Sequence, residues 1–260
     1  MSAAIELKRL CVATRDHRLL LDNISLALER ETTTAILGRS GSGKTTLLRT
    51  VNCTVEPTSG EIVVNGADAR QLDLITLRRG MGYVIQEAGL FPHFTVARNV
   101  AIVLEAMGRP LRERERRSAE LLASVGLDPA VFARRYPHQL SGGQRQRVSV
   151  ARALAADPGI LLMDEPFGAL DPLTRAEMQD MLRVLLARLG KTVLLVTHDL
   201  DEALYLADRI VLIDQGKLIA DLAPDSFMQS QRPEVQAYVR AYRRGEPRTS
   251  NVAASREGHG

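Results

Sequence analysis

The sequence is poor in aromatic and sulfur-bearing side chains. It has no tryptophan, aromatic residues make up 4% of its 260 residues, and its two cysteines are Cys11 and Cys53. Two cysteines alone cannot build a disulfide framework or a four-ligand zinc site, so we expect reduced thiols in the cytosol. So few aromatic rings also leave little for stacking nucleic-acid bases or for caging a quaternary ammonium ion.

Long hydrophobic runs and a strong charge of one sign are missing as well. No apolar run approaches the ~20 residues that a membrane span needs, and the N-terminus lacks the basic and apolar segments of a signal peptide. The 34 Lys and Arg nearly cancel the 31 Asp and Glu, which does not favour nucleic acid as a partner. Hydrophobic residues at 45% and charged residues at 25% are typical of a globular α/β domain.

Short apolar segments alternate with helical segments along most of the chain. The strand candidates are Thr33–Leu37, Tyr83–Ile85, Ile160–Met163, Val193–Val196 and Ile210–Ile213. The helix candidates are Thr45–Thr50, Gly143–Ala156, Thr174–Leu189 and Leu200–Ala207. Such alternation predicts an α/β fold with a mostly parallel sheet and helices on both faces.

The start, middle and end of the chain depart from this pattern. Antiparallel strands are expected near the N-terminus, at Ile5–Val12, Leu20–Leu28 and Gly60–Gly66. Residues 95–158 are mostly helical in pattern, and the mixed charges of Arg112–Arg117 predict a solvated helix face. Residues 243–260 contain almost nothing apolar and are expected to form a disordered tail. We therefore predict one domain over residues 1–242, with a helical subdomain at about 95–158.

A glycine-rich loop gives the first sign of chemistry. Its residues match the phosphate-binding pattern GxxxxGK[ST], followed by a further threonine: Gly38, Arg39, Ser40, Gly41, Ser42, Gly43, Lys44, Thr45 and Thr46. A strand precedes the loop and a helix follows it, and in this setting backbone N–H groups cradle phosphates. Lys44 is expected to reach the terminal phosphates and Thr45 to ligate Mg²⁺. An ordinary glycine-rich turn is the alternative, which the flanking strand and helix disfavour.

Two adjacent carboxylates, Asp164 and Glu165, end the strand candidate at residues 160–163. Ligands bind at the carboxyl ends of parallel strands, so we expect both groups beside the phosphate loop. Asp164 would hold Mg²⁺ through water, and Glu165 would polarise the attacking water as general base. A helix cap would explain such a pair in isolation, but beside a phosphate loop the pair indicates a nucleotide site.

Two other polar residues also follow strand candidates. His198 ends the apolar segment Val193–Thr197, which places its imidazole beside Glu165 at the same sheet edge. Gln86 follows Tyr83–Ile85 in the same way. Both are therefore expected at the nucleotide site.

A second anion-binding loop precedes the acidic strand. It consists of Ser141, Gly142, Gly143 and Gln144 at the start of a helix, where backbone N–H groups attract anions. A single chain does not need both this loop and the phosphate loop to bind one triphosphate. A head-to-tail pair of chains would use both loops, because each Ser141–Gln144 loop would close on the nucleotide held by the other chain.

Together these motifs resemble the ATP-binding subunit of ABC transporters, from about Ile5 to Tyr242. The resemblance implies a P-loop NTPase (RecA-like) fold: a mostly parallel core, an antiparallel β subdomain and an inserted helical subdomain. It implies that Gln86 senses Mg²⁺ and the membrane partner, that His198 contacts the γ-phosphate, and that the loop containing Asp171 crosses the dimer. The implied cofactors are ATP and Mg²⁺. The implied partners are a second ATP-binding subunit, membrane permease subunits and, indirectly, a substrate-binding protein, at the cytoplasmic face of the membrane.

One expected feature is missing from this chain. Family members usually carry an aromatic residue near position 14 that stacks on adenine, whereas this chain has Thr14-Arg15-Asp16-His17. Our hypothesis is that His17 or Arg15 stacks on the base and that discrimination between bases is weak.

Several segments resemble subunits that import quaternary-amine osmoprotectants such as glycine betaine, carnitine or choline: Met81–Val96, Asp164–Leu173, Leu189–Thr192 and Thr197–Ala203. The residues Arg134–Gln139 also resemble the importer pattern. An ATPase of a lipid or amino-acid transporter and a soluble ABC ATPase of translation or DNA repair are the alternatives. Many osmoprotectant subunits append regulatory modules, which we do not expect in the 18 residues after Tyr242.

Overall fold

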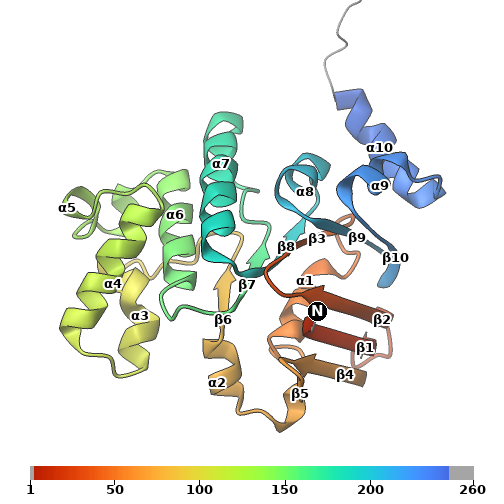
Figure 1. Ribbon diagram of the computed structural model, residues 1–260, viewed down its shortest axis with the longest axis horizontal. Coiled ribbons are helices and arrows are strands. Elements are labelled where there is room, and N and C mark those ends of the chain that lie inside the picture. The colour runs from red at the N-terminus through yellow and green to blue at the C-terminus, as the bar shows by residue number, and fades with distance from the viewer. Residues whose placement is uncertain (1–2, 246–260) are drawn as a thin grey trace, which may run out of the picture.

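A six-stranded sheet forms the centre of the computed structural model, which describes residues 3–245 (Figure 1). Its order is β10-β9-β3-β8-β7-β6, parallel except for β10, which pairs antiparallel with β9. The strands are β3 (Thr33–Leu37), β6 (Met81–Val84), β7 (Ile160–Asp164), β8 (Thr192–Thr197), β9 (Arg209–Asp214) and β10 (Lys217–Leu222). Leu194 and Val196 lie in one apolar cluster, and Val193 and Leu195 in another on the opposite face. Burial on both faces explains why these strands have consecutive apolar residues.

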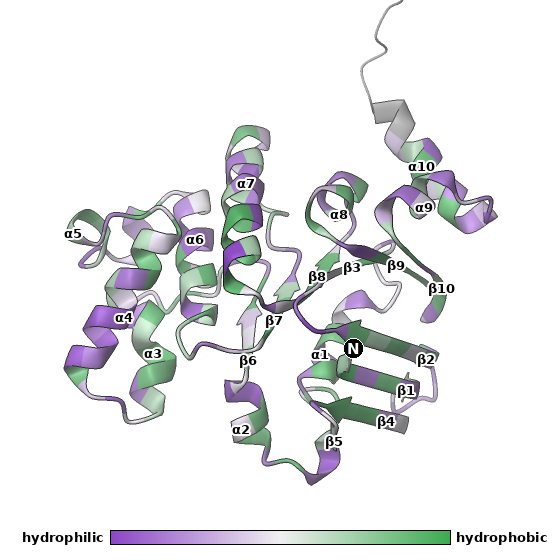
Figure 2. Cartoon of the chain, in the orientation of Figure 1, coloured by the Kyte–Doolittle hydropathy of each residue, from purple (hydrophilic) through white to green (hydrophobic). Residues whose placement is uncertain are grey.

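A four-stranded antiparallel sheet packs against one face of this core. Its order is β2-β1-β4-β5, formed by β1 (Ala3–Ala13), β2 (Leu19–Glu29), β4 (Ser59–Val64) and β5 (Ala67–Asp68). Asn65 and Gly66, both with positive φ, make the two-residue turn between β4 and β5, as tight hairpins require. Apolar residues colour β1, β2 and β4 green in Figure 2, and their buried side chains share a cluster with α1 (Lys44–Val51).

Helices cover the remaining faces. The segment between β6 and β7 contains α3 (Val96–Ala106), α4 (Leu111–Ser124), α5 (Pro129–Phe132), the 3₁₀ turn η2 (Pro137–Gln139) and α6 (Gly142–Ala153). In Figure 1 these helices lie together on the left, away from the antiparallel sheet. The other helical elements are η1 (Ala69–Gln71), α2 (Leu74–Arg79), α7 (Pro172–Leu189), α8 (Leu200–Leu206), α9 (Pro224–Gln229) and α10 (Pro233–Gly245).

Local sequence explains where the helices nearest the site begin and end. Asp171 caps α7 by accepting a hydrogen bond from the Thr174 N–H, Pro172 occupies the first turn, and Gly190 ends the helix with φ 56°. At α6 the hydroxyl of Ser141 accepts from the Gln144 N–H, while the Gln144 side chain accepts from the Ser141 N–H. This reciprocal capping box fixes the direction in which α6 leaves its loop.

The expected α/β class, with its parallel core and antiparallel sheet, is confirmed, while several boundaries differ. β6 begins two residues before the predicted strand, and α6 ends at Ala153 instead of Ala156 because the chain tightens into an i+3 bond from the Ala155 N–H to Arg152. α10 continues to Gly245, three residues into the segment expected to be disordered, and residues 246–260 lie outside the described part. Within residues 3–245, no helix is both long and apolar enough to span a bilayer.

Candidate active site

The phosphate loop, residues 38–45, connects β3 to α1. Its geometry depends on glycine: a Cβ on Gly38 would lie 2.4 Å from the Ile213 carbonyl oxygen, and Gly43 has φ 107°. Lys44 Nζ donates to the carbonyl oxygens of Gly38 at 2.8 Å and Arg39 at 3.0 Å. These carbonyls hold the ammonium group inside the loop, where a bound phosphate would meet it.

Burial acts on the charge of Lys44. The residue is 5% exposed, and desolvation lowers the pKa of its amine, while the carboxylates of Glu165 and Asp164 raise it. The Glu165 Oε1 atom lies 3.9 Å from Nζ. The two carboxylates therefore help to keep a buried cation charged, as binding to a triphosphate requires.

Asp164 ends β7 directly beside the start of α1. Its Oδ1 accepts a hydrogen bond from the Thr45 hydroxyl at 3.0 Å, and its Oδ2 accepts from the Tyr83 hydroxyl at 3.5 Å. Burial raises the pKa of the Asp164 carboxyl, and the hydrogen bond from Thr45 opposes that rise. The structure thus brings together two of the residues predicted to hold Mg²⁺.

Glu165 lies where three segments of the sheet edge meet. Its N–H donates to the Val196 carbonyl, and its φ of 45° turns the chain sharply after β7. Its Oε2 lies 3.1 Å from His198 Nδ1 and 3.4 Å from Gln86 Nε2. The side chains predicted from three separate strand ends therefore meet at one carboxylate, which is positioned to accept a proton from water.

A cavity of about 590 Å³ opens over the phosphate loop, and neither Asp164 nor His198 is part of its lining. Its lining includes Lys44, Thr45, Thr46, Gln86 and Glu165. The wall on the other side comes from the β1–β2 turn and the β9–β10 turn: Arg18, Leu19, Leu20, Gln215 and Gly216. Neither Arg15 nor His17, the hypothesised base-stacking residues, is part of this lining, so that hypothesis stays a prediction.

The residues present suit a nucleotide with Mg²⁺. The hydroxyl of Thr45, the carboxylate of Asp164 and the side-chain amide of Gln86 offer oxygen ligands, which Mg²⁺ prefers. Within residues 3–245 no cluster of three or more His, Cys, Asp or Glu forms a protein-only metal cage. Mg²⁺ is typically bound through one or two carboxylates together with substrate phosphates, so this donor set fits. The hydroxyl of Ser42 is buried in the loop without a hydrogen-bond partner, on the side of Gly38.

The Ser141–Gln144 loop does not reach this cavity. None of its four residues lines the cavity over the phosphate loop, and Gly142 instead lines a neighbouring depression with Ala169 and Leu170, which shares Gln86 with that cavity. Gly143 is required for packing, since a Cβ there would lie 2.4 Å from Thr174 Cγ2 on α7. Asp171 also points to its own helix as the cap of α7. Within one chain these predicted nucleotide contacts therefore stay apart from the phosphate loop.

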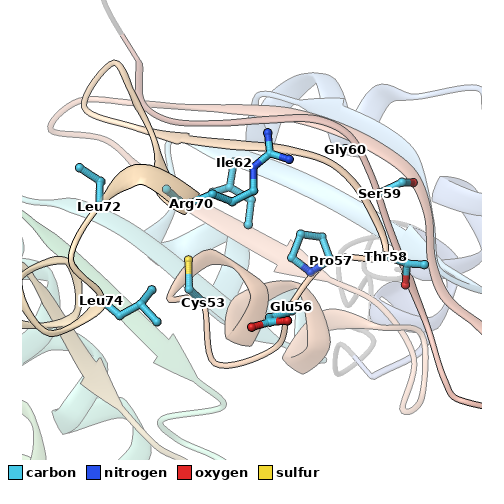
Figure 3. A pocket seen from close by; sticks show the side chains of 11 residues that line it. Cys53, Glu56, Pro57, Thr58, Ser59, Gly60, Ile62, Arg70, Leu72 and Leu74 are labelled. Atoms are coloured by element: carbon cyan, nitrogen blue, oxygen red, sulfur yellow. The ribbon is translucent and has the colours of Figure 1, made fainter.

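A different cavity of about 380 Å³ lies between the end of α1, β4 and the β5–α2 connection (Figure 3). Its side chains are mainly apolar, with Ile62, Leu72 and Leu74 beside Cys53 and Arg70. Burial raises the pKa of the Cys53 thiol, which favours the unreactive protonated form. Arg70 pairs with Asp68 at 2.8 Å, so its charge is already compensated. Neither Cys53 nor Arg70 is therefore set up for chemistry in this cavity.

Sequence reasoning missed some of the side chains that shape the site. Tyr83 was assigned only to a strand, although its hydroxyl reaches Asp164. Gln215 and Gly216 line the cavity because β9 runs parallel to β3 and ends at the same edge. A Gln-Gly turn directly after an apolar strand was the available signal. No local pattern marks Leu19, which is 53% exposed at the start of β2.

The comparisons with known proteins agree with this geometry. The family described as "ABC transporter" matches residues 21–168. The chain is 45% identical over 208 residues to the osmoprotectant import ATP-binding protein OsmV of Salmonella typhimurium, which covers 80% of this chain and 54% of that protein. It is 49% identical over 199 residues to the glycine betaine uptake system ATP-binding protein YehX of Escherichia coli, covering 76% of this chain and 64% of that one. The chain thus spans between about half and two thirds of the length of these relatives.

Solved structures resemble the fold as well. The ATP-binding cassette MJ0796, solved as a dimer in a post-hydrolysis state with ADP and Pi, is 35% identical and superposes with a TM-score of 0.76. The match covers 85% of this chain and 98% of that chain.

Proposed function

The chain belongs to the ABC transporter family, and on that basis we propose that it binds and hydrolyses ATP to power an importer. The observation that carries this proposal is the meeting of Lys44, Thr45, Asp164 and Glu165 at the carboxyl edge of one sheet. His198 contacts the same Glu165 at 3.1 Å. This is the combination that phosphoryl transfer to water needs: positive charge for the phosphates, ligands for a metal, and a base for the water.

In the proposed reaction the phosphates lie along residues 38–46, and Lys44 exchanges its contacts with loop carbonyls for contacts with phosphate oxygens. Thr45, Asp164 and Gln86 would hold Mg²⁺, which supplies additional positive charge to the phosphates. Glu165 orients the attacking water and accepts its proton, while His198 holds the Glu165 carboxylate in place. Positioned charge contributes most of the rate enhancement, because phosphoryl transfer leaves little covalent work for protein groups.

We propose that the working unit is a pair of like chains. The separation of the Ser141–Gln144 loop from the cavity of its own chain supports this proposal. In a head-to-tail pair this loop closes over the γ-phosphate held by the partner, and the loop containing Asp171 crosses between the chains. The dimeric MJ0796 cassette is a related protein that assembles in pairs.

A groove of about 540 Å³ is the proposed docking site for the membrane partner. It lies between α2, α3, α6 and the edge strand β6, and its lining includes Ile75, Tyr83, Phe91, Ile102 and Val103. Exposed apolar side chains such as Ile75, at 59%, and Phe91, at 42%, suit a short apolar helix on the cytoplasmic side of a permease. Docking there would place the chain at the cytoplasmic face of the membrane, next to the proposed helical subdomain at about 95–158.

The proposed cargo is a quaternary-amine osmoprotectant such as glycine betaine, reaching the permease through a substrate-binding protein. The similarity to OsmV, an osmoprotectant import protein, and to YehX, a glycine betaine uptake protein, supports this class. A tagged pull-down from detergent-solubilised native membranes, with mass spectrometry of the co-purifying subunits, tests the proposal. We expect a permease whose binding protein takes up betaine-like ligands. A lipid or amino-acid permease would overturn the cargo, and the absence of any membrane subunit would overturn the transporter role.

A further inference from the structure

Two segments that have a part in the proposed mechanism are joined by one arginine. Residues 166–171 form the loop expected to cross the dimer, and residues 197–199 form the turn that carries His198. Arg175, in the first turns of α7, reaches both. Its Nη2 donates to the Leu170 carbonyl at 3.3 Å, and its Nη1 lies 3.7 Å from Asp199 Oδ2.

Hydrogen bonds through Thr197 also stabilise the turn that carries His198. The Thr197 hydroxyl accepts a hydrogen bond from the Asp199 N–H at 3.0 Å and donates its own proton to the Glu202 carboxylate. Glu202 is 4% exposed, a burial that a carboxyl group tolerates only when it is hydrogen-bonded or paired. The proposed reaction gives this buried acid no role, although it lies four residues after His198.

The charges around Glu202 come from two elements. From the β8–α8 turn, Asp199 raises the pKa of its carboxyl and His198 lowers it; from α7, Arg175 lowers it. Burial has the largest effect, and the pKa of Glu202 is raised to about 7. Arg175 thus pairs with Asp199 in the turn and lowers the pKa of Glu202 on α8, while it contacts the loop on the other side.

We propose that Arg175 is a positioning residue that ties the loop at residues 166–171 to the turn carrying His198, with Glu202 anchoring that turn through Thr197. The inference rests on the proposed function, because it assigns these contacts to the timing of ATP hydrolysis. When a partner chain displaces the loop, the Leu170 carbonyl moves with it, and Arg175 passes that movement to Asp199. The tie thereby keeps His198 beside Glu165, 3.1 Å from its Oε2, while the partner chain acts on the loop.

The location of the four residues separates this role from nucleotide binding. None of Arg175, Thr197, Asp199 and Glu202 lines the cavity over the phosphate loop. Removing the tie should therefore lower kcat and leave the affinity for ATP nearly unchanged. A loss of fold would lower both.

The first test is steady-state ATP hydrolysis by the full chain with Arg175→Met and Arg175→Lys. We expect Arg175→Met to lower kcat about tenfold while KM stays within about twofold, since small displacements of reacting groups have effects of this size or larger. Arg175→Lys should recover part of the loss because it keeps the charge beside Asp199. Arg183→Met is the matched control on α7, where the guanidinium lies over Tyr205, and it should leave kcat unchanged. Equal loss in both methionine variants, or a rise in KM alone, would overturn the proposal.

Amide hydrogen exchange provides a readout that does not require turnover. In Arg175→Met, amide exchange should accelerate at least threefold at both Leu170 and Asp199. In the wild type the Leu170 N–H bonds to the Phe167 carbonyl, and the Asp199 N–H bonds to the Thr197 hydroxyl. Arg183→Met should change neither amide. If the wild-type chain does not hydrolyse ATP, the proposed function fails, while exchange still decides whether Arg175 joins the two segments. Acceleration at one amide only would overturn the tie.

The pH profile of kcat tests the part played by Glu202. Glu202→Gln keeps an oxygen that can accept from Thr197 but cannot change its charge. In the wild type we expect an added fall in kcat as pH drops through about 7, where Glu202 takes up a proton and its hydrogen bond from Thr197 loses the strength that the negative charge gives it. This component should be missing in Glu202→Gln and present in the surface control Glu177→Gln. Superimposable wild-type and Glu202→Gln profiles would remove Glu202 from the proposal.

Discussion

Two glycine-rich loops in this molecule lead into helices, and they differ in whether a side chain caps the first N–H groups of the helix. At α1 the residue before the helix is Gly43, in a left-handed conformation, with no side chain capping the first N–H groups. At α6 that residue is Ser141, and a capping box closes the start of the helix. An uncapped helix start lined by Lys44 is a phosphate site that the chain completes with its own residues. The self-capped start is preformed, and in our proposal another chain brings the phosphate to it.

The carboxylates follow the same division. We call the phosphate loop and the strand ends beside it the α1 side, and the Ser141–Gln144 loop the α6 side. On the α1 side, Asp164 is hydrogen-bonded to Thr45, and Glu165 to Gln86 and His198. Asp171, in contrast, caps α7 near the α6 side. Nucleotide binding should therefore depend on the α1 side alone, whereas hydrolysis should need both. The following variants test each side separately.

The largest effect is expected for Glu165→Gln, on the α1 side. The amide cannot accept a proton from water, so kcat should fall about a thousandfold, the scale of removing a general base from a preorganised site. Because Asp164 and the bound phosphates still favour the charged form of Lys44, the variant should still bind ATP and pair with a second chain. Hydrolysis and ATP-dependent dimer formation, followed by size-exclusion chromatography, measure both properties. Wild-type turnover in this variant would contradict the role of Glu165.

A loss of about a hundredfold in ATP affinity is expected for Lys44→Ala. The ammonium group is buried among loop carbonyls and carboxylates, so the variant leaves phosphate oxygens without their charged partner. Binding of a fluorescent ATP analogue measures the change. Lys191→Ala is the control, since its ammonium pairs with the surface residue Asp157 at 2.9 Å. Unchanged affinity in Lys44→Ala would mean that the phosphates bind elsewhere.

The residues at the α1 side could be predicted because their positions follow from general rules. Strand ends in a parallel sheet share one edge, so Asp164, Glu165 and His198 had to meet near a loop that follows β3. The tie through Arg175 could not be predicted, since it depends on the packing of α7 against the turn before α8. The contacts of Asn99 are similar: its side-chain amide donates to the Phe91 and Phe94 carbonyls, and only the folded loop brings these groups together.

On the α6 side, Gly143→Ala should lower kcat about tenfold and leave ATP affinity within about twofold. The added Cβ would lie 2.4 Å from Thr174 Cγ2, so α6 must shift against α7, at a cost of about 1–3 kcal/mol for overpacking. Thr174→Ser removes the obstructing methyl group, and the double variant should regain most of the activity. Hydrolysis rates and thermal unfolding of the three variants measure this. A loss of ATP affinity in Gly143→Ala would erase the distinction between the two sides.

The smallest effect is expected at the wall where the base should lie. Leu19 offers an apolar surface there in place of an aromatic ring, so Leu19→Ala should weaken ATP binding about two- to fivefold through lost apolar contact. Following our hypothesis of weak discrimination between bases, ATP and GTP should bind with similar affinity. Competition titrations of the wild type and Leu19→Ala measure both. A strong preference for ATP that survives Arg15→Ala with His17→Ala would also refute stacking by those two residues.

Mixing two inactive variants tests the central claim, that each reaction site combines the α1 side of one chain with the α6 side of another. Lys44→Ala disables the first side, and Ser141→Arg blocks the second with a bulky cation. Each variant alone should hydrolyse ATP at background rate. Mixed in equal amounts, the pair should regain up to about a quarter of wild-type activity, because half of the dimers then contain one intact site. Background activity at every mixing ratio, with both variants folded and dimeric, would contradict the two-chain site.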